Sequence, residues 1–329
     1  FESHLRHHIF NNKELNMSES EIIETKENRW LGSIVGLAIG DQLGSLSEMK
    51  APGSFERVRG MDEGTLWTDD TSQALCIADS LISLKKIDLV DQLQRFDQWY
   101  TTGYLSCVGW GYGCGPTVKT AIVGFRESGV PSPVTNEPTN GSLMRLSPVP
   151  LFYSNDMQMA IEMSGKSSLT THDHPLCIDA CRLYASMIVK AVNGKNKAEI
   201  LEYDADLWKD NPLADPIDAI ARGSYKEKSP PPVTGTTFGT EVPDGIRGTL
   251  NVVESIEASI WVFNVTGSFA AGALQAVNLG DDADTTAAIF GQLGGAYYGY
   301  NQIPEAWKAK LLDRTLVEYI AKKLYEAHL

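Results

Sequence analysis

The stretch Asn278-Leu-Gly-Asp-Asp-Ala-Asp-Thr-Thr286 gathers three aspartates and two threonines within six residues. Residues that can face a core follow at helical spacing, namely Ile289, Leu293, Ala296 and Tyr297. The pattern predicts a helix that buries one face and carries the acids on its first turn. A single acid would be enough to cap the exposed amides and to suit the helix dipole. Packed carboxylates repel one another unless a cation lies among them, and oxygen ligands of this kind select Mg²⁺, Mn²⁺ or Ca²⁺.

A second acidic cluster, Trp67-Thr-Asp-Asp-Thr71, lies over two hundred residues upstream. It is also followed by an amphipathic pattern, formed by Leu75, Ala78 and Ile82. Each cluster taken alone could be no more than a helix cap. If the fold brings the two together, they can hold two divalent ions about 3.5–4 Å apart, a spacing at which a metal pair orients water and sugar or phosphate oxygens.

Three further segments accompany the two clusters, and the five together resemble the ADP-ribosylglycohydrolase family. In chain order they are Gly36-Leu-Ala-Ile-Gly40-Asp41-Gln-Leu-Gly44, Trp67-Thr-Asp-Asp-Thr71, Gly111-Tyr-Gly-Cys-Gly115, Asn140-Gly-Ser-Leu-Met-Arg145 and Asn278-Leu-Gly-Asp-Asp-Ala-Asp-Thr285. Each segment is short, but all five occur in the family's order. The resemblance runs from about Arg29 to the C-terminus.

This resemblance implies a hydrolase that cleaves the N- or O-glycosidic bond between ADP-ribose and an acceptor. A protein arginine side chain is the favoured acceptor, while serine, another side chain, a nucleobase or a small molecule stay open. It also implies two Mg²⁺ or Mn²⁺ ions, with the expected ligands Thr68, Asp69, Asp70, Asp282, Asp284 and Thr285.

The predicted catalytic carboxylates are Glu48, Asp69 and Asp282. Nearby carboxylates would stabilise an oxocarbenium-like anomeric carbon while water attacks it. Glu48 or a metal-bound water would handle the proton. Asp281 stands where the family usually has a second glycine, which leaves either Asp281 or Asp282 as the ligand, and Asp282 is preferred.

The predicted substrate-binding residues come from three segments. Glycines and aromatics fill the segment Gly103–Gly115, where backbone amides can approach an anion, although a plain covering loop would have the same composition. In the next segment an arginine near a helix start suits a diphosphate. His172 resembles the family's Thr-His segment and is expected to donate or accept a supporting hydrogen bond. The predicted set is Gly111, Tyr112, Gly113, Gly115, Asn140, Gly141, Ser142, Arg145 and His172.

The fold class predicted from the sequence is all-α, a single compact multi-helix domain over residues 29–329. Alternating strand patterns are scarce, whereas helical periodicity recurs along the chain. From Trp30 onward a stripe of Gly32, Gly36 and Gly40 should let another helix approach closely. Asp41 and Glu48 are expected to follow this helix. A Pro- and Gly-rich stretch at residues 223–247 is expected to cover the edge of the site.

The composition of the chain limits the kinds of partner and the compartment that can be expected. The chain has 329 residues, 43% hydrophobic and 21% charged, with a net charge of −14. This balance argues against binding nucleic acid by charge. The sequence has no apolar run long enough to span a membrane and no secretory signal, and five cysteines without zinc spacing favour a reducing compartment, so a cytoplasmic protein is expected.

Residues 1–28 are polar and are expected to form an N-terminal arm outside the domain. The arm is either a plain tail or a segment that docks on an ADP-ribosyltransferase. A second function class is therefore a binding or inhibitory protein that blocks such a transferase. A third, a two-metal phosphoesterase, would use the same carboxylates and would release AMP rather than ADP-ribose.

Overall fold

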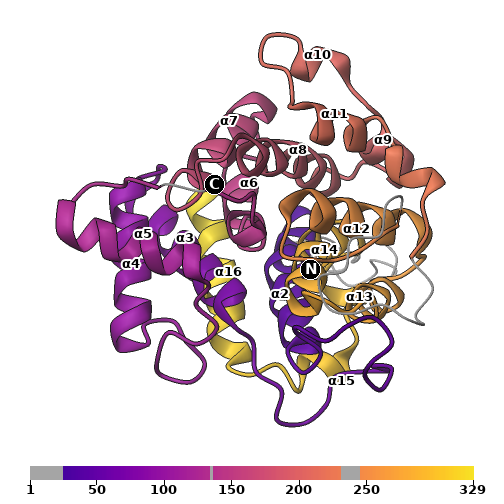
Figure 1. The fold of residues 1–329 in the computed structure, drawn as a ribbon, viewed down its shortest axis with the longest axis horizontal. Coiled ribbons are helices and arrows are strands. Elements are labelled where there is room, and N and C mark those ends of the chain that lie inside the picture. The colour runs from indigo at the N-terminus through magenta and orange to yellow at the C-terminus, as the bar shows by residue number, and fades with distance from the viewer. Residues whose placement is uncertain (1–24, 134–135, 231–244) are drawn as a thin grey trace, which may run out of the picture.

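The computed structural model describes residues 25–133, 136–230 and 245–329. Within these residues the chain is helical and no strand forms (Figure 1). Backbone pairing between distant segments is limited there to isolated bridges such as Lys50–Asp281 and Thr139–Asn251. The predicted all-α class is confirmed. None of the described helices combines the length and the apolar character needed to span a lipid bilayer.

Two buried helices, α2 (Lys26–Gly44) and α14 (Ala283–Tyr298), form the centre of the molecule (Figure 1). They run antiparallel and touch through their backbones. A Cβ atom on Gly36 would lie 2.4 Å from the carbonyl oxygen of Gly291, and one on Gly40 would lie 2.1 Å from that of Ala287. Only glycine allows such an approach. The predicted role of the glycine stripe is confirmed, and its partner is the helix that follows the acidic stretch.

The remaining helices surround this pair. On one side lie α3 (Asp69–Leu84), α4 (Leu89–Thr102), α5 (Pro116–Ser128), α6 (Pro148–Phe152) and α16 (Arg314–His328). The rest of the shell comprises α7 (Met157–Ser168), α8 (Pro175–Val192), α12 (Val252–Val265), α13 (Phe269–Val277) and α15 (Glu305–Lys308). Single 3₁₀ turns occur at η1 (Asn140–Ser142), η2 (Ser224–Glu227) and η3 (Tyr300–Gln302).

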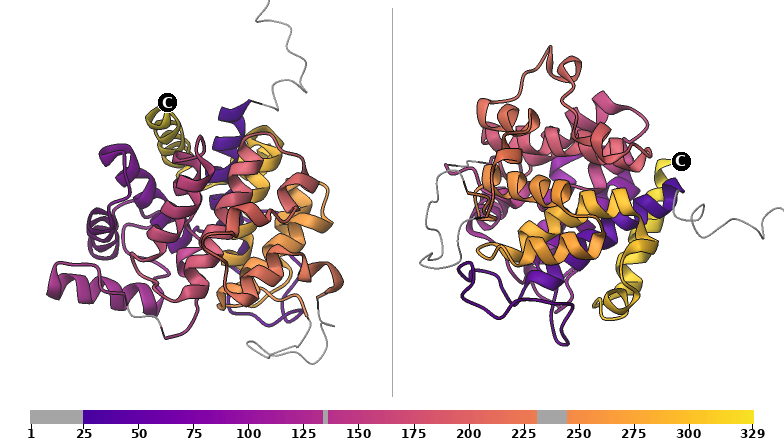
Figure 2. Two further views of the ribbon diagram at one scale, coloured as in Figure 1. Left: turned by 90° about the horizontal axis from the view of Figure 1, so that it is seen from above. Right: turned by 90° about the vertical axis from the view of Figure 1, so that its right-hand side faces the viewer.

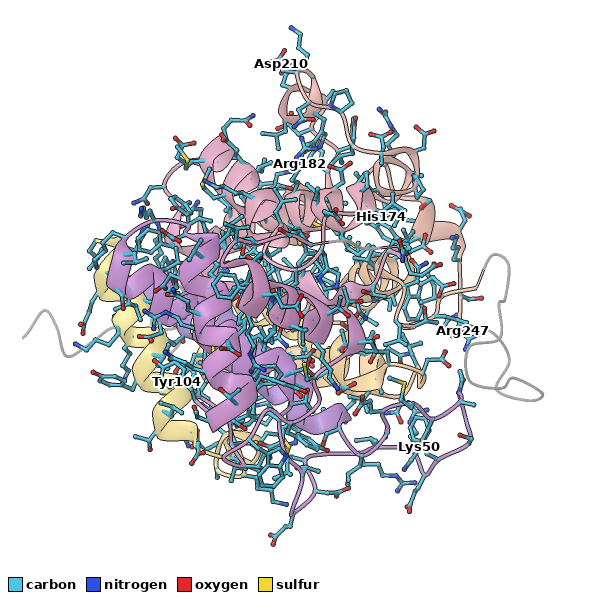
Figure 3. All side chains as sticks on the ribbon, turned by 60° about the vertical axis from the view of Figure 1, so that its left-hand side comes forward. Lys50, Tyr104, His174, Arg182, Asp210 and Arg247 are labelled. Atoms are coloured by element: carbon cyan, nitrogen blue, oxygen red, sulfur yellow. The ribbon has the colours of Figure 1, made fainter. Side chains whose placement is uncertain are left out.

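Three short helices follow α8, namely α9 (Lys197–Leu201), α10 (Ala205–Trp208) and α11 (Asp215–Ala221), and α10 lies at the top of Figure 1. The segment that holds them forms the top of the right view of Figure 2. Arg182 of α8 (Pro175–Val192) holds this segment against α8. Its guanidinium donates to Asp179 Oδ1 and to the carbonyl oxygen of Asn211, each at 2.6 Å, and lies 5.6 Å from the Trp208 ring. Asp210 lies at the tip, above Arg182 (Figure 3).

The N-terminal boundary differs slightly from the prediction. Helix α2 begins at Lys26, because Thr25 Oγ1 accepts a hydrogen bond from the Asn28 amide at 3.1 Å and caps the helix. Asn28 is already buried, so the domain includes the end of the predicted arm. The rest of the arm, residues 1–24, lies outside the described residues. Asp41 was expected after the helix but lies in its last turn.

Candidate active site

A pocket of roughly 370 Å³ opens where the two acidic clusters meet. Its wall includes acids from both clusters together with apolar and small polar side chains. The lining residues are Glu48, Met49, Asp69, Asp70, Gly113, Gly115, Pro116, Thr117, Val118, Glu137, Thr139, Asn140, Gly141, Met144, His172, Leu250, Asp282, Asp284 and Thr285. The fold therefore joins the two helix starts, and the backbone contact between α2 and α14 places Asp41 of α2 beside them.

Asp41 holds the first turn of α3 in place. Its carboxylate accepts hydrogen bonds from the Thr68 amide at 2.9 Å and from the Thr71 amide at 3.0 Å. The Thr71 hydroxyl donates to it at 2.6 Å and the Thr68 hydroxyl at 3.0 Å. An acid from another helix thus caps α3. The sequence placed Asp41 in a motif but did not identify it as a candidate ligand.

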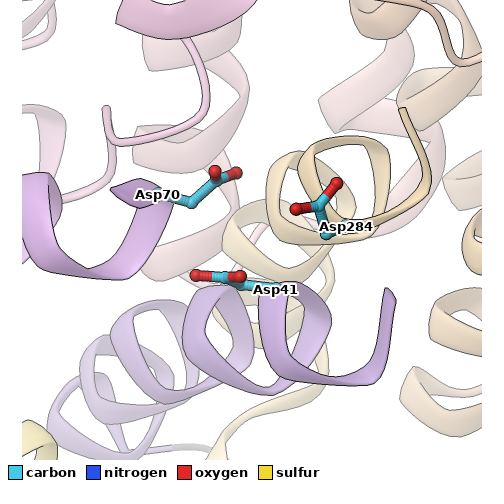
Figure 4. Close-up of side chains that lie close together, drawn as sticks. All are labelled: Asp41, Asp70 and Asp284. Atoms are coloured by element: carbon cyan, nitrogen blue, oxygen red, sulfur yellow. The ribbon is translucent and has the colours of Figure 1, made fainter. Parts of the chain in front are cut away.

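Two groups of carboxylates converge at the base of the pocket. In the first, Asp41, Asp70 and Asp284 each offer an oxygen, and these oxygens all lie within 4.8 Å of one another (Figure 4). In the second, Glu48, Asp282 and Asp284 do the same. Asp284 belongs to both groups, so two cation positions would share it. We call these five residues the acid centre.

Burial and mutual repulsion disfavour the charged form of these acids. Burial raises the pKa of Asp70 and of Asp284 well above the usual range, and neighbouring carboxylates raise each pKa further. Burial, with Asp282 and Asp41 close by, raises the pKa of Glu48 to about 7. Burial also raises the pKa of Asp41, but only to about 6, because the hydrogen bonds from Thr71 and Thr68 oppose its effect.

Two carboxylate oxygens of the acid centre are buried without a hydrogen-bond donor among the described residues, Asp70 Oδ1 and Asp284 Oδ1. Leaving such atoms unpaired is costly unless another group compensates them. A divalent cation would supply that compensation, and an all-oxygen donor set fits Mg²⁺ or Mn²⁺. The residues present therefore fit the expected kind of metal ion.

The loop that carries Glu48 is fastened to the start of α14. The Asp281 amide donates to the carbonyl oxygen of Lys50, and the Met49 amide donates to that of Asp281, both at 2.7 Å. Asp281 has a φ of 55°, in the left-handed region that glycine favours. Its carboxylate pairs with buried Arg247, whose Nε lies 2.8 Å away. Lys50 and Arg247 lie on the same side of the molecule (Figure 3).

Asp282 and Asp69, both predicted to be catalytic and to bind metal, occupy different settings. Asp282 lines the pocket, joins the second carboxylate group and accepts a hydrogen bond from Asn140 Nδ2 at 2.6 Å. Asp281, the alternative ligand, pairs instead with Arg247, and the preference for Asp282 as a metal ligand stays a prediction. Asp69 also lines the pocket but belongs to neither group, and its Oδ2 accepts from Gln73 Nε2 at 3.0 Å.

The predicted metal ligands Thr68 and Thr285 contact the acid centre through their hydroxyls. Thr68 Oγ1 lies 3.2 Å from Asp70 Oδ2 and Thr285 Oγ1 lies 3.5 Å from the same oxygen. Both hydroxyls are buried with the carboxylates. Their place beside Asp70 is compatible with coordination and with a supporting hydrogen bond.

The predicted substrate-binding residues divide into two sets. Gly113, Gly115, Asn140, Gly141 and His172 line the pocket. Gly113 has a φ of 83°, and a Cβ atom there would lie 2.7 Å from Asp69 Oδ1, so a side chain at this position would collide with the site. A Cβ atom on Gly141 would lie 2.8 Å from the His172 ring.

The second set lies outside the pocket lining, namely Gly111, Tyr112, Ser142 and Arg145. The structure contradicts the prediction that Arg145 binds a diphosphate, because this residue is 1% exposed and its guanidinium lies 4.6 Å from the Phe96 ring. It cannot meet a diphosphate in the pocket. The sequence placed it near a helix start, where a solvent-facing arginine and a buried one have the same neighbours in the chain.

Sequence reasoning missed much of the wall, including Met49, Glu137, Thr139 and Leu250. The wall at residues 137–140 is paired with residues 249–252. The Asn140 amide donates to the carbonyl oxygen of Leu250 at 3.0 Å, and the Val252 amide donates to that of Pro138 at 2.7 Å. No local sequence pattern predicts this pairing, because both segments are irregular. Of the stretch at residues 223–247 that is predicted to cover the edge of the site, residues 231–244 lie outside the described residues.

Known proteins resemble this chain over most of its length. A family model described as ADP-ribosylglycohydrolase matches residues 23–329. The chain is 31% identical over 309 residues to the ADP-ribosylarginine hydrolase Tri1 of Pseudomonas putida (strain GB-1), covering 91% of this chain and 78% of that protein. It is 26% identical to the ADP-ribosyl-[dinitrogen reductase] glycohydrolase of Rhodospirillum rubrum, covering 86% of this chain and 90% of that protein. A solved structure, titled ADP-ribosylglycohydrolase-related protein complex, superposes with a TM-score of 0.78 at 31% identity, covering 92% of this chain and 99% of that one.

Proposed function

Since this chain belongs to the ADP-ribosylglycohydrolase family and is a glycosyl hydrolase, we propose that it releases ADP-ribose from arginine side chains of modified proteins. Two relatives support arginine as the acceptor. The proteins of Pseudomonas putida and Serratia proteamaculans, 31% and 30% identical to this chain, are named ADP-ribosylarginine hydrolases. The observation that carries the proposal is the acid centre at the base of the pocket.

We further infer that two divalent cations, Mg²⁺ or Mn²⁺, bind at the acid centre. Asp41, Asp70 and Asp284 would hold one, and Glu48, Asp282 and Asp284 the other. Thr68 and Thr285 are predicted to contribute hydroxyl oxygens. When bound, such ions neutralise the carboxylates and polarise sugar hydroxyls and water.

The side chains of the pocket suit hydrolysis at an anomeric carbon. Positive charge develops on that carbon in the transition state, where the carboxylates of Asp69 and Asp282 stabilise it. The oxygen of a water molecule bonds to the carbon as the carbon–nitrogen bond breaks. Glu48 accepts the proton of that water, and the guanidine leaves with the bonding electrons. Glu48 lines the pocket, so its carboxylate lies where it can accept this proton.

The test offers arginine-linked and serine-linked ADP-ribosyl proteins to the full chain with Mg²⁺ and identifies the products. We expect intact ADP-ribose from the arginine-linked protein and loss of activity in EDTA. The Asp70→Asn variant should be inactive, while Asp210→Asn, an exposed aspartate at the tip of the α9–α11 segment, should match the parent. Release of AMP would identify a phosphoesterase, and undiminished activity in EDTA would rule out the metal proposal.

A further inference from the structure

A chain of hydrogen bonds runs behind the pocket wall and passes through Arg145. On one side the Arg145 guanidinium donates to Gln73 Oε1, and Gln73 Nε2 donates to Asp69 Oδ2 at 3.0 Å. On the other side Arg145 Nη2 donates to Thr171 Oγ1 at 2.6 Å. The Thr171 hydroxyl lies 2.6 Å from His172 Nδ1. Arg145 therefore connects two residues of the pocket lining, Asp69 and His172.

The chemistry of these groups fixes their orientations. A guanidinium can only donate, so the amide of Gln73 must turn its oxygen to Arg145, and its nitrogen is then left to donate to Asp69. The Thr171 oxygen must likewise accept from Arg145. The far nitrogen of His172, Nε2, lies 2.9 Å from the hydroxyl of Thr139.

Arg145 carries a charge but forms no salt bridge among the described residues. A buried cation without an ion pair is costly, so neighbouring dipoles and more distant carboxylates must compensate it. Gln73 and Thr171 supply the dipoles, and Asp69 supplies the nearest carboxylate along the chain of hydrogen bonds. Burial and the charge of Arg145 lower the pKa of His172 to about 3, so its ring stays neutral.

We propose that Arg145 is a positioning residue that holds two parts of the pocket lining at once, Asp69 through Gln73 and His172 through Thr171. The proposal rests on the glycohydrolase function, because it connects Arg145 to the reacting carboxylate on one side and to the wall that binds ADP-ribose on the other. We call Gln73 with Asp69 the catalytic arm, and Thr171 with His172 the binding arm. Gln73 and Thr171 are then positioning residues as well.

Each arm has its own variant and its own readout. Thr171→Val removes the hydroxyl at nearly constant shape and should weaken ADP-ribose binding, measured by calorimetry, about threefold to tenfold while kcat changes less than about twofold. Gln73→Leu should lower kcat about tenfold and leave the ADP-ribose dissociation constant within about twofold. Thr170→Val is the matched control, since the Thr170 hydroxyl is also buried but bonds Gln92 Oε1 at 2.7 Å, outside this chain.

Arg145→Lys supplies the decisive background, because one ammonium cannot span both Gln73 and Thr171. We expect both quantities to change in Arg145→Lys, and a second substitution of Gln73 or Thr171 to add less than about twofold. Full, independent effects in that background would overturn the proposal. If Arg145→Lys does not fold, the two single variants decide, and unchanged binding in Thr171→Val or unchanged kcat in Gln73→Leu overturns it.

These outcomes stay separate from those of the proposed function. If the parent protein binds ADP-ribose but does not release it from arginine, the acceptor proposal is wrong. The ADP-ribose affinities of Thr171→Val and Arg145→Lys then decide whether Arg145 is a positioning residue. Thermal unfolding of every variant confirms that a change in binding is not a loss of folded protein.

Discussion

Each acidic helix start has one buried arginine behind it, and the two arginines are connected in different ways. At the start of α14, Arg247 pairs directly with Asp281, and both side chains are almost completely buried. At the start of α3, Arg145 reaches Asp69 only through the amide of Gln73. Asp281 does not line the pocket, whereas Asp69 does.

This difference separates Asp281, an acid that stabilises the fold, from Asp69, an acid that is available in the pocket. A direct ion pair neutralises the carboxylate and turns it toward the arginine, so Asp281 serves as an anchor for the neighbouring loops. A bridging amide occupies one oxygen of Asp69 and leaves its other oxygen beside Gly113 at the pocket. Acids at the starts of two helices with similar motifs can therefore have different roles.

Removing the anchor should have the largest effect. Asp281→Ala leaves Arg247 as an unpaired buried charge, and we expect it to lower the free energy of unfolding by about 3–5 kcal/mol in urea titrations. The double variant Asp281→Ala/Arg247→Met should recover most of that loss. Gln73→Leu breaks one hydrogen bond to Arg145 and should cost only about 1.5–3 kcal/mol. Equal losses in the two single variants would remove the distinction between the two arginines.

A substitution in the acid centre should lower activity without destabilising the fold. Asp284→Asn removes a carboxylate shared by both groups, and we expect activity with Mg²⁺ to fall roughly 10²–10³-fold. The metal-free variant should unfold at a higher temperature than the parent, because one buried and repelled carboxylate is gone. A lower unfolding temperature in EDTA would mean that Asp284 anchors the fold as Asp281 does.

The seam between α2 and α14 allows a matched pair of substitutions. Gly40→Ala and Gly32→Ala each place a methyl group against the α14 backbone, and each should cost about 1–3 kcal/mol of unfolding free energy. Only Gly40 lies next to Asp41, so only Gly40→Ala should also weaken Mg²⁺ binding measured by calorimetry. Equal Mg²⁺ affinities in the two variants would show that the seam does not set the spacing of the acids.

The smallest expected effect is the pH dependence of the metal-free protein. Its folded state holds Glu48 with a pKa raised from 4.5 to about 7, so it binds more protons than the unfolded chain between those values. Stability must then fall as the pH rises from about 4.5 to 7, and we expect the unfolding midpoint to drop by a few degrees. Mg²⁺ should remove the drop and Glu48→Gln should reduce it. A midpoint that rises over this interval would contradict the repulsion among the acids.

Local periodicity and residue chemistry were enough to predict the all-α class, the glycine stripe and the helices that follow the two acidic clusters. Gly36 and Gly40 indicated a close helix contact because glycines four residues apart fall on one face of a helix and leave its backbone uncovered there. The burial of Arg145 could not be predicted, since its partners Gln73 and Thr171 are distant in the chain. The role of Asp281 depended in the same way on Arg247, which lies in a Pro- and Gly-rich stretch without periodicity. In both cases, contacts between residues far apart in the chain determine the role of the side chain.

The backbone contact between α2 and α14 also bears on how the site is assembled. Two helices that touch at Gly36 and Gly291 cannot slide by one residue, because the side chains next to these glycines would meet the opposite backbone. Their register is therefore set when the chain folds. The carboxyl groups of Asp41 and Asp284 are brought together by the same helix contact, so the acid centre would be preorganised for a cation and cation binding would not need to order it.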